Sequence, residues 1–174
     1  SSADGNTAVG LDCLKAITSG DHNVFMGFEC GDAITTGGGN VGIGVRNLKA
    51  MQTGSNNTCV GYGNIRYATA NTATQNASLG YNALSGTSFD ASYNTALGYL
   101  AQGSGLLGFQ TGNYNIAVGD SAQKRMTSGV GNVSVGSASG FWISTGDYNT
   151  SIGHLALDAC TTADNNTAVG KAAL

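Results

Sequence analysis

Residues 115–119 read Asn-Ile-Ala-Val-Gly, and the same frame, Asn-x-x-aliphatic-Gly, returns at 132–136, 149–153 and 166–170. Extended in both directions, the frame covers the chain with spacings of 17, 17, 17, 19, 18, 21, 17, 17 and 17 residues. A repeat of this length along a whole chain indicates a stack of similar structural units. Its copies begin at Asn6, Asn23, Asn40, Asn57, Asn76, Asn94, Asn115, Asn132, Asn149 and Asn166.

Several other positions of the unit also repeat. The fifth residue of the frame is always glycine, and a small residue usually follows three positions later. The fourth residue is apolar in every copy, namely Val9, Met26, Ile43, Val60, Leu79, Leu97, Val118, Val135, Ile152 and Val169. Seven residues after the frame glycine most units have a second apolar or small residue, namely Ile17, Ile34, Met51, Ala68, Met126, Ile143 and Cys160.

This pattern predicts strands rather than helices. β-Branched residues that alternate with small ones between glycines are typical of strands, whereas each glycine inside a helix costs about 1 kcal/mol relative to alanine. We expect every unit to hold a short strand, a tight turn, a second short strand and a glycine turn. The sequence therefore predicts one all-β domain over residues 1–174, a parallel β-solenoid of about ten rungs stacked roughly 4.8 Å apart. The longer units place insertions at 71–74, 89–91 and 103–111.

Composition excludes several other classes. The chain has 28 glycines and no proline, which rules out collagen, and it is 41% apolar, which rules out a disordered linker. The net charge is −3 and Lys124-Arg125 is the only adjacent basic pair, so no nucleic-acid partner is expected. Apolar runs are too short to span a bilayer, so no membrane insertion is expected. Because Ser1 stands in place of an initiator Met, we expect a fragment of a longer fibre chain.

Stacking predicts a role for each repeated residue. The frame asparagine of each rung is expected to donate to one neighbouring rung and accept from the other, so that all ten form an amide ladder. The frame glycine supplies a positive φ or a close approach at a corner. The fourth-position aliphatic side chains are expected to form a buried row. Since a two-stranded rung is thin, with little room inside, several chains sharing one core are favoured.

The frames Asn-Thr-Ala-Val-Gly (6–10 and 166–170), Asn-Thr-Ala-Leu-Gly (94–98) and Asn-Thr-Ser-Ile-Gly (149–153) resemble the head repeat of YadA-like trimeric autotransporter adhesins. They are equally similar to the Asn-Thr-Ala-Val-Gly-x-x-Ala-Leu repeats of phage tail fibres and other virion attachment fibres. The resemblance covers essentially the whole chain. It implies a left-handed β-roll, a homotrimer, and attachment to a cell-surface receptor.

Two settings follow from this resemblance. The first is a non-enzymatic segment of a phage or virion tail fibre, and the second is the head of a bacterial adhesin; both place the chain outside the cell, on a virion or a bacterial surface. Four cysteines favour the tail fibre, because unpaired thiols are a hazard during export through an oxidising periplasm. An ice-binding β-solenoid is a third alternative, although the threonine row after the frame asparagine is interrupted in half of the units.

Aromatic residues are the candidate ligand-binding residues. Two rows share a repeat position, and each either stacks on sugar rings of a glycan receptor or fills a seam between chains. Trp142, next to Phe141, has the same two interpretations. The row just after the frame glycine is Phe28, Tyr62, Tyr81 and Tyr99, and the row just before the frame asparagine is Tyr93, Tyr114 and Tyr148.

No catalytic, metal or cofactor site is expected. His22 and His154 fall about eight rungs apart, so they cannot meet in one chain. Cys13 and Cys30 share a repeat position on neighbouring rungs, with Cα atoms about 5 Å apart, which a disulfide would permit. Stacked side chains point in parallel, however, and this favours small buried thiols.

Overall fold

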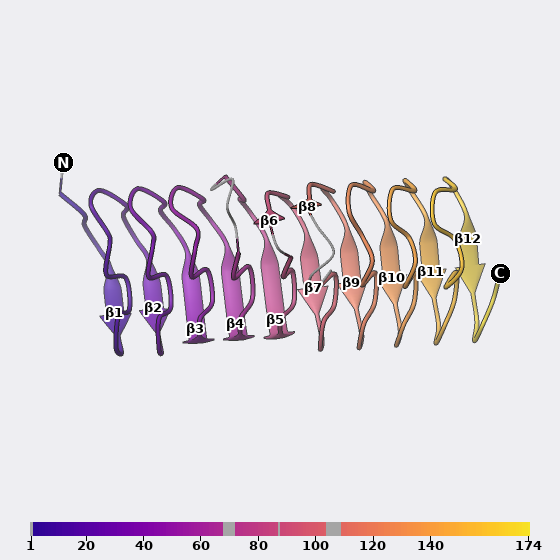
Figure 1. Ribbon diagram of the computed structural model, residues 1–174, viewed down its shortest axis with the longest axis horizontal. Helices are drawn as coiled ribbons and strands as arrows, with labels where there is room; N and C mark the ends of the chain where they lie inside the picture. Colours follow the sequence, from indigo (N-terminus) through magenta and orange to yellow (C-terminus); the bar gives the residue numbers. More distant parts are fainter. Residues whose placement is uncertain (1, 68–71, 87, 104–108) are drawn as a thin grey trace.

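The computed structural model describes residues 2–67, 72–86, 88–103 and 109–174, which form a rod of stacked coils with the two termini at opposite ends (Figure 1). One long sheet runs the length of the rod, and each coil contributes one short strand to it. The strands are β1 Thr7–Val9, β2 Val24–Met26, β3 Val41–Val45, β4 Thr58–Tyr62, β5 Ala77–Tyr81, β7 Thr95–Leu97, β9 Ile116–Val118, β10 Val133–Val135, β11 Thr150–Ile152 and β12 Thr167–Val169.

The ten strands pair in parallel and in chain order, so the predicted all-β parallel β-solenoid is confirmed, with about nine turns. Equivalent frame positions face one another, as in Ala117, Ser134 and Ser151. Units of 19 and 21 residues keep this register, since Thr58 pairs with Ala77 and Thr95 with Ile116. The extra residues are therefore accommodated outside the sheet.

We predicted a second strand in every unit, and this prediction is wrong for most of the units that the structure describes. Strands in that part of the unit are β6 (Ser88–Phe89) and β8 (Phe109–Gln110), which pair with each other and fall in or beside two predicted insertions. In the regular units the chain turns too sharply for a ladder. The backbone N–H groups of 18, 19 and 20 all donate to the carbonyl oxygen of Thr35, at 2.9, 3.0 and 3.2 Å. Residues 68, 71 and 104–108, on which predictions were also made, lie outside the described residues.

The interior of the coil is filled from two sides. From the sheet, the third residue of the frame points inward, and from the opposite segment come two rows of larger side chains. One row stands four residues after the frame glycine and the other seven residues after it. The buried members are Phe25, Cys59, Ala96, Ala117 and Ala168 from the sheet, then Leu14, Leu48, Ile65, Leu84 and Leu157, and then Ile34, Met51, Met126 and Ile143.

The buried leucines lie in a left-handed backbone conformation that the sequence did not reveal. Leu14, Leu48 and Leu157 have φ of 54°, 54° and 53°, and Ile65 has φ of 47°. A left-handed residue costs roughly 1–2 kcal/mol. Full burial of an aliphatic side chain returns about 1.5–3 kcal/mol. Packing of these side chains against the sheet therefore offsets the cost of the turn that carries them.

Candidate interaction surfaces

The outer face of the sheet is apolar and uncovered. The fourth-position side chains, which we expected to be buried, point outward in the single chain: Val135 is 38% and Ile152 41% exposed, and Val118 is half-buried. Strand alternation explains the correction, because the third residue of each frame already points inward. The second-position side chains lie on the same outer face. The twenty residues of these two rows include no charged side chain.

A shallow groove of about 280 Å³ crosses this face at β4, β5 and β7. Its outward-facing walls are Thr58, Val60, Leu79 and Leu97. A continuous apolar strip on the surface of a rod is typical of a surface that another molecule covers.

The threonine row of the ice-binding alternative lies on this face. Thr7, Thr58, Thr95 and Thr167 are exposed and Thr150 is half-buried, but Val24, Val41, Ala77, Ile116 and Val133 occupy the positions between them. Hydroxyl groups are therefore spaced irregularly along the rod.

The first tyrosine row forms a stack along one border of the sheet. The rings of Tyr62 and Tyr81 are 5.1 Å apart and those of Tyr81 and Tyr99 are 5.3 Å apart, nearly parallel in both cases. Stacking uses the ring faces, so the edges of these rings and the outer faces of the two end rings remain for a ligand. Phe28 does not join the stack, because Val45 occupies the equivalent position on the coil between Phe28 and Tyr62. The guanidinium of Arg46 lies 5.5 Å from the Phe28 ring centre.

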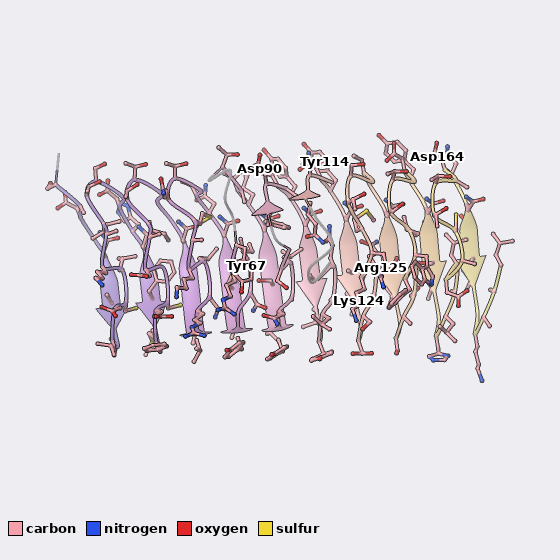
Figure 2. All side chains as sticks on the ribbon, viewed as in Figure 1. Tyr67, Asp90, Tyr114, Lys124, Arg125 and Asp164 are labelled. Carbon is pink, nitrogen blue, oxygen red and sulfur yellow. The ribbon has the colours of Figure 1, made fainter. Side chains whose placement is uncertain are left out.

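The second tyrosine row follows the opposite border. Tyr93 and Tyr114 stack at 4.8 Å, and the ring of Tyr148 lies against Gly131, where an added Cβ would be 2.7 Å from it. Figure 2 shows Tyr114 on the same edge of the rod as Asp90 and Asp164. The structure therefore keeps both predicted rows exposed, apart from the half-buried Tyr62, with one row on each side of the apolar sheet face.

Trp142 lies away from both rows, in a cluster that the sequence did not reveal. The guanidinium of Arg125, from the preceding coil, is 4.7 Å from the Trp142 ring, and the ammonium of Lys124 is 5.7 Å from the ring of Phe141. Phe141 and Trp142 meet edge to face at 5.3 Å. Basic residues one unit before aromatic ones are the signal that could have predicted these contacts.

The asparagine ladder is confirmed and is more extensive than predicted. In all nine steps the side-chain Oδ1 of one frame asparagine accepts the backbone N–H of the next, at 2.8 to 3.1 Å. The Nδ2 group also closes its own coil, as when Asn132 donates to the carbonyl oxygen of Gly146 at 2.8 Å. A shorter ladder at another position, from Asn47 through Asn64 to the N–H of Ala83, was not anticipated.

The four cysteines are free thiols, in agreement with the favoured prediction. Burial raises the pKa of Cys30 and of Cys59 to about 12, and it also raises the pKa of Cys13. Cys160 is partly exposed.

We expect Cys30 and Cys59 to resist alkylation in the native protein. At pH 8, four pH units below a pKa of about 12, only roughly one thiol in 10,000 is the reactive thiolate. Iodoacetamide labelling followed by peptide mass spectrometry should modify Cys160 first, and all four sites in 6 M guanidinium chloride. Native labelling of Cys59 at the rate of Cys160 would contradict the buried placement.

The described residues include no group of three or more His, Cys, Asp or Glu side chains that could hold a metal ion. Among those residues there is also no helix that could cross a membrane. Comparisons with models of protein families, with curated proteins and with solved structures found no match to the chain. The exposed surfaces of the rod are therefore the basis for a functional proposal.

Proposed function

We propose that this chain is a rod-forming segment of an extracellular attachment fibre, in which three copies pack through the outer sheet face and present their remaining surface to a cell-surface receptor. The uncharged apolar face of the ten-stranded sheet is the observation that carries the proposal. Because the repeat places equivalent side chains at every rung, a second copy can meet this face along the whole rod. A glycan is the receptor class that the two exposed tyrosine rows favour.

A virion tail fibre is the setting we favour over a bacterial adhesin head. The free thiols of Cys30 and Cys59 lie in the interior, where they remain reduced if the rod folds inside a cell. The repeat frame supports both settings equally.

The double variant Val118→Asp/Val135→Asp is expected to convert a trimer into single chains. Both positions point out of the sheet, so the charges leave the coil interior unchanged but would be buried between copies, where an unpaired carboxylate is strongly disfavoured. Light scattering after size-exclusion chromatography at micromolar concentration should show a threefold fall in mass, with an unchanged far-UV circular dichroism spectrum. Ser128→Asp/Ala159→Asp adds the same charges at exposed positions off the sheet and should stay trimeric.

A wild-type mass of one chain would refute the trimer, and a trimeric double variant would refute the sheet face as its interface. Attachment itself is tested by adsorption of the fluorescently labelled wild-type chain to a panel of bacterial cells. Adsorption to none of them would count against the proposed receptor role.

A further inference from the structure

The side of the coil opposite the sheet carries most of the positive charge of an acidic chain. Two adjacent positions, the tenth and eleventh counted from the frame asparagine, lie between two buried rows. They face outward in the described units, except that Ser85, Gly86 and Gly103 are buried. We call these positions the cationic face. Five of the seven basic residues of the chain occur there, with two carboxylates, Asp32 and Asp158. The basic residues are Lys15, Lys49, Arg66, Lys124 and Arg125.

The coil geometry keeps this face clear of the sheet. The rows on either side of it point inward: an added Cβ at Gly140 would meet Ser134 of the sheet at 2.5 Å and Ile143 at 2.9 Å. Figure 2 shows Tyr67, Lys124 and Arg125 at a similar height, between the two edges of the rod. A trimer formed through the sheet would therefore leave the cationic face exposed.

A groove of about 300 Å³ lies at one end of this face. It is lined by two small residues, Ala33 and Ala50, by the ring of Tyr67, and by the charged residues Asp32, Lys49 and Arg66. Backbone bonds hold these coils in register, since the N–H of Ala33 donates to Lys49 at 3.1 Å and that of Ala50 to Arg66 at 3.2 Å. The guanidinium of Arg66 lies 4.8 Å from the ring of Tyr67.

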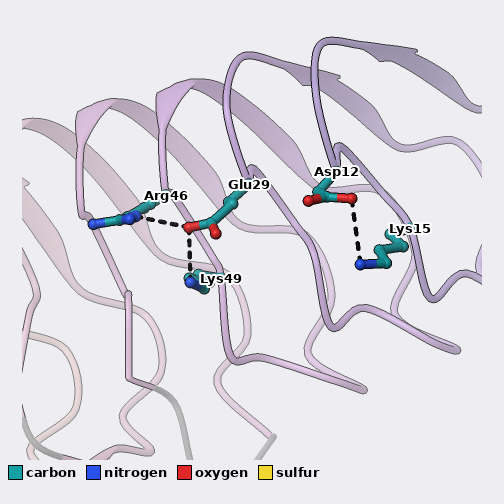
Figure 3. A network of polar contacts seen from close by, with 5 residues as sticks. All are labelled: Asp12, Lys15, Glu29, Arg46 and Lys49. Atoms are coloured by element: carbon teal, nitrogen blue, oxygen red, sulfur yellow. Dashed lines mark hydrogen bonds and ion pairs between the residues drawn. The ribbon is translucent and has the colours of Figure 1, made fainter.

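The basic residues of this face differ in how far they are neutralised. Glu29 binds Arg46 and Lys49, each at 2.7 Å, and Lys15 lies 3.3 Å from Asp12 (Figure 3). Lys49 and Arg46 hold the pKa of Glu29 below its ordinary value, so this carboxylate stays charged.

The remaining cations are free to meet an anion. Arg66, Lys124 and Arg125 have no carboxylate within ion-pair distance in the described part of the chain. The buried Nε atoms of Arg66 and Arg125 also lack a hydrogen-bond partner among those residues.

At the other end of the face, the ring of Trp142 is exposed. Arg125 covers one side of its ring, and the next coil has the small residue Ala159 at the equivalent position. A planar guanidinium binds carboxylates in a bidentate manner, and an aromatic ring beside it can pack on the C–H face of a sugar. Both ends of the cationic face therefore combine an unpaired guanidinium with an exposed ring.

From these features we propose that the cationic face binds an anionic polysaccharide laid along the rod. Tyr67 and Trp142 contact sugar rings, while Arg66 and Arg125 bind carboxylate groups. Three rungs, roughly 14 Å, separate Tyr67 from Lys124 along the axis. On the coils between them, the described positions of the face, Ser85, Gly86 and Gly103, are buried. A polymer long enough to span these coils can contact both ends and gain from multivalency. This inference rests on the proposed attachment function and names the chemical class of its receptor.

Charge density favours a polysaccharide over nucleic acid. Five cations and two carboxylates leave at most three net positive charges over roughly 38 Å of rod, because Lys15 and Lys49 are already paired with Asp12 and Glu29. Double-stranded DNA has one charge per about 1.7 Å, far more than this face can neutralise. A polymer with an occasional carboxylate and many hydroxyl groups fits spaced cations, and the carboxylates of the face can accept bonds from its hydroxyls.

The test is binding of the full chain to immobilised alginate, with dextran of equal length as the neutral reference, by biolayer interferometry at 50 and 300 mM NaCl. We expect alginate binding that weakens at high salt and negligible dextran binding. Arg66→Gln and Arg125→Gln should each weaken binding about fivefold or more, and the double variant at least twentyfold. Lys171→Gln makes the same charge change at an exposed position off this face and should stay within twofold of wild type.

Several outcomes would overturn the inference: equal binding to dextran and alginate, variants that match Lys171→Gln, or stronger binding to phosphatidylglycerol vesicles than to alginate. Mass measurements and cell adsorption on the same variants separate this inference from the proposed function. A double variant that remains trimeric and still adsorbs to cells refutes the polysaccharide site and leaves the attachment function in place. A wild-type chain that binds alginate but adsorbs to no cell refutes the attachment function and leaves the polysaccharide site in place.

Discussion

Asn132→Ala is expected to lower the free energy of unfolding by about 3–5 kcal/mol. The fully buried Asn132 side chain donates to Asn115 Oδ1 at 3.2 Å and to the Gly146 carbonyl at 2.8 Å. Its Oδ1 accepts the N–H and the Nδ2 of Asn149 at 2.9 and 3.0 Å. Alanine would leave buried backbone groups without partners, at about 1–3 kcal/mol each. Guanidinium chloride unfolding monitored by circular dichroism measures the change.

Asn166→Ala is the matched control, since Asn166 is the last member of the ladder in this chain. Its side chain donates to Asn149 Oδ1 at 2.9 Å, but its Oδ1, unlike that of Asn132, accepts no bond from a further frame asparagine among the 174 residues. We expect a loss of about 1 kcal/mol or less. Equal losses for the two variants would show that the ladder does not carry the stability assigned to it.

Gly136→Ala is expected to destabilise the rod by more than about 3 kcal/mol or to prevent its folding. The backbone of Gly136 has φ of 132°, and an added Cβ would lie 2.7 Å from the carbonyl carbon and oxygen of Gly153 in the next coil. Both atoms belong to the backbone, so relief requires the two coils to separate and the adjacent ladder bonds to lengthen. In a stacked repeat, stability depends on contacts between neighbouring units, so a break in the middle affects both halves.

Gly170→Ala is the control that separates the effect of the steric clash from the effect of the strained φ. Gly170 has a similar φ of 124°, but the nearest heavy atom to an added Cβ would be the Cβ of Ala173, 3.9 Å away. Thermal unfolding of both variants by circular dichroism should show a small decrease in melting temperature for Gly170→Ala and a large one for Gly136→Ala. A small decrease for both would mean that the coils are not stacked as closely as the structure shows.

The part of the fold that could be predicted is the part that repeats. Stacking makes each residue a neighbour of its own counterpart, so an asparagine or glycine that returns in every unit must satisfy the same contact each time. The repeat alone is therefore sufficient to predict the Asn132 ladder and the close approach at Gly136. The surface predictions were less complete, because the contacts between Arg125 and Trp142 join different residue types in neighbouring units and occur once.

The turn that carries Leu48 and Ile65 could not be read from the sequence. Leucine and isoleucine rarely adopt a left-handed conformation, so local preference points away from the observed backbone. Packing in the coil interior overrides that preference. The same holds for Phe25, whose large ring fits inside because the neighbouring Gly31 and Gly42 have no side chains; an added Cβ at Gly42 would lie 2.4 Å from the ring.

The period, the parallel register and the ladder follow from the amino-acid sequence, because each depends on identical neighbours at a fixed spacing. Which face of the strands is the interior depends instead on the three-dimensional packing. Both faces carry apolar residues, so alternation alone cannot decide whether Val135 or Ser134 points outward. The choice follows from the opposite side of the coil, where Ile143 and Leu157 already fill the thin interior and leave room only for small side chains from most strands. The larger aliphatic residues are therefore outside, where the proposed partner chains would cover them.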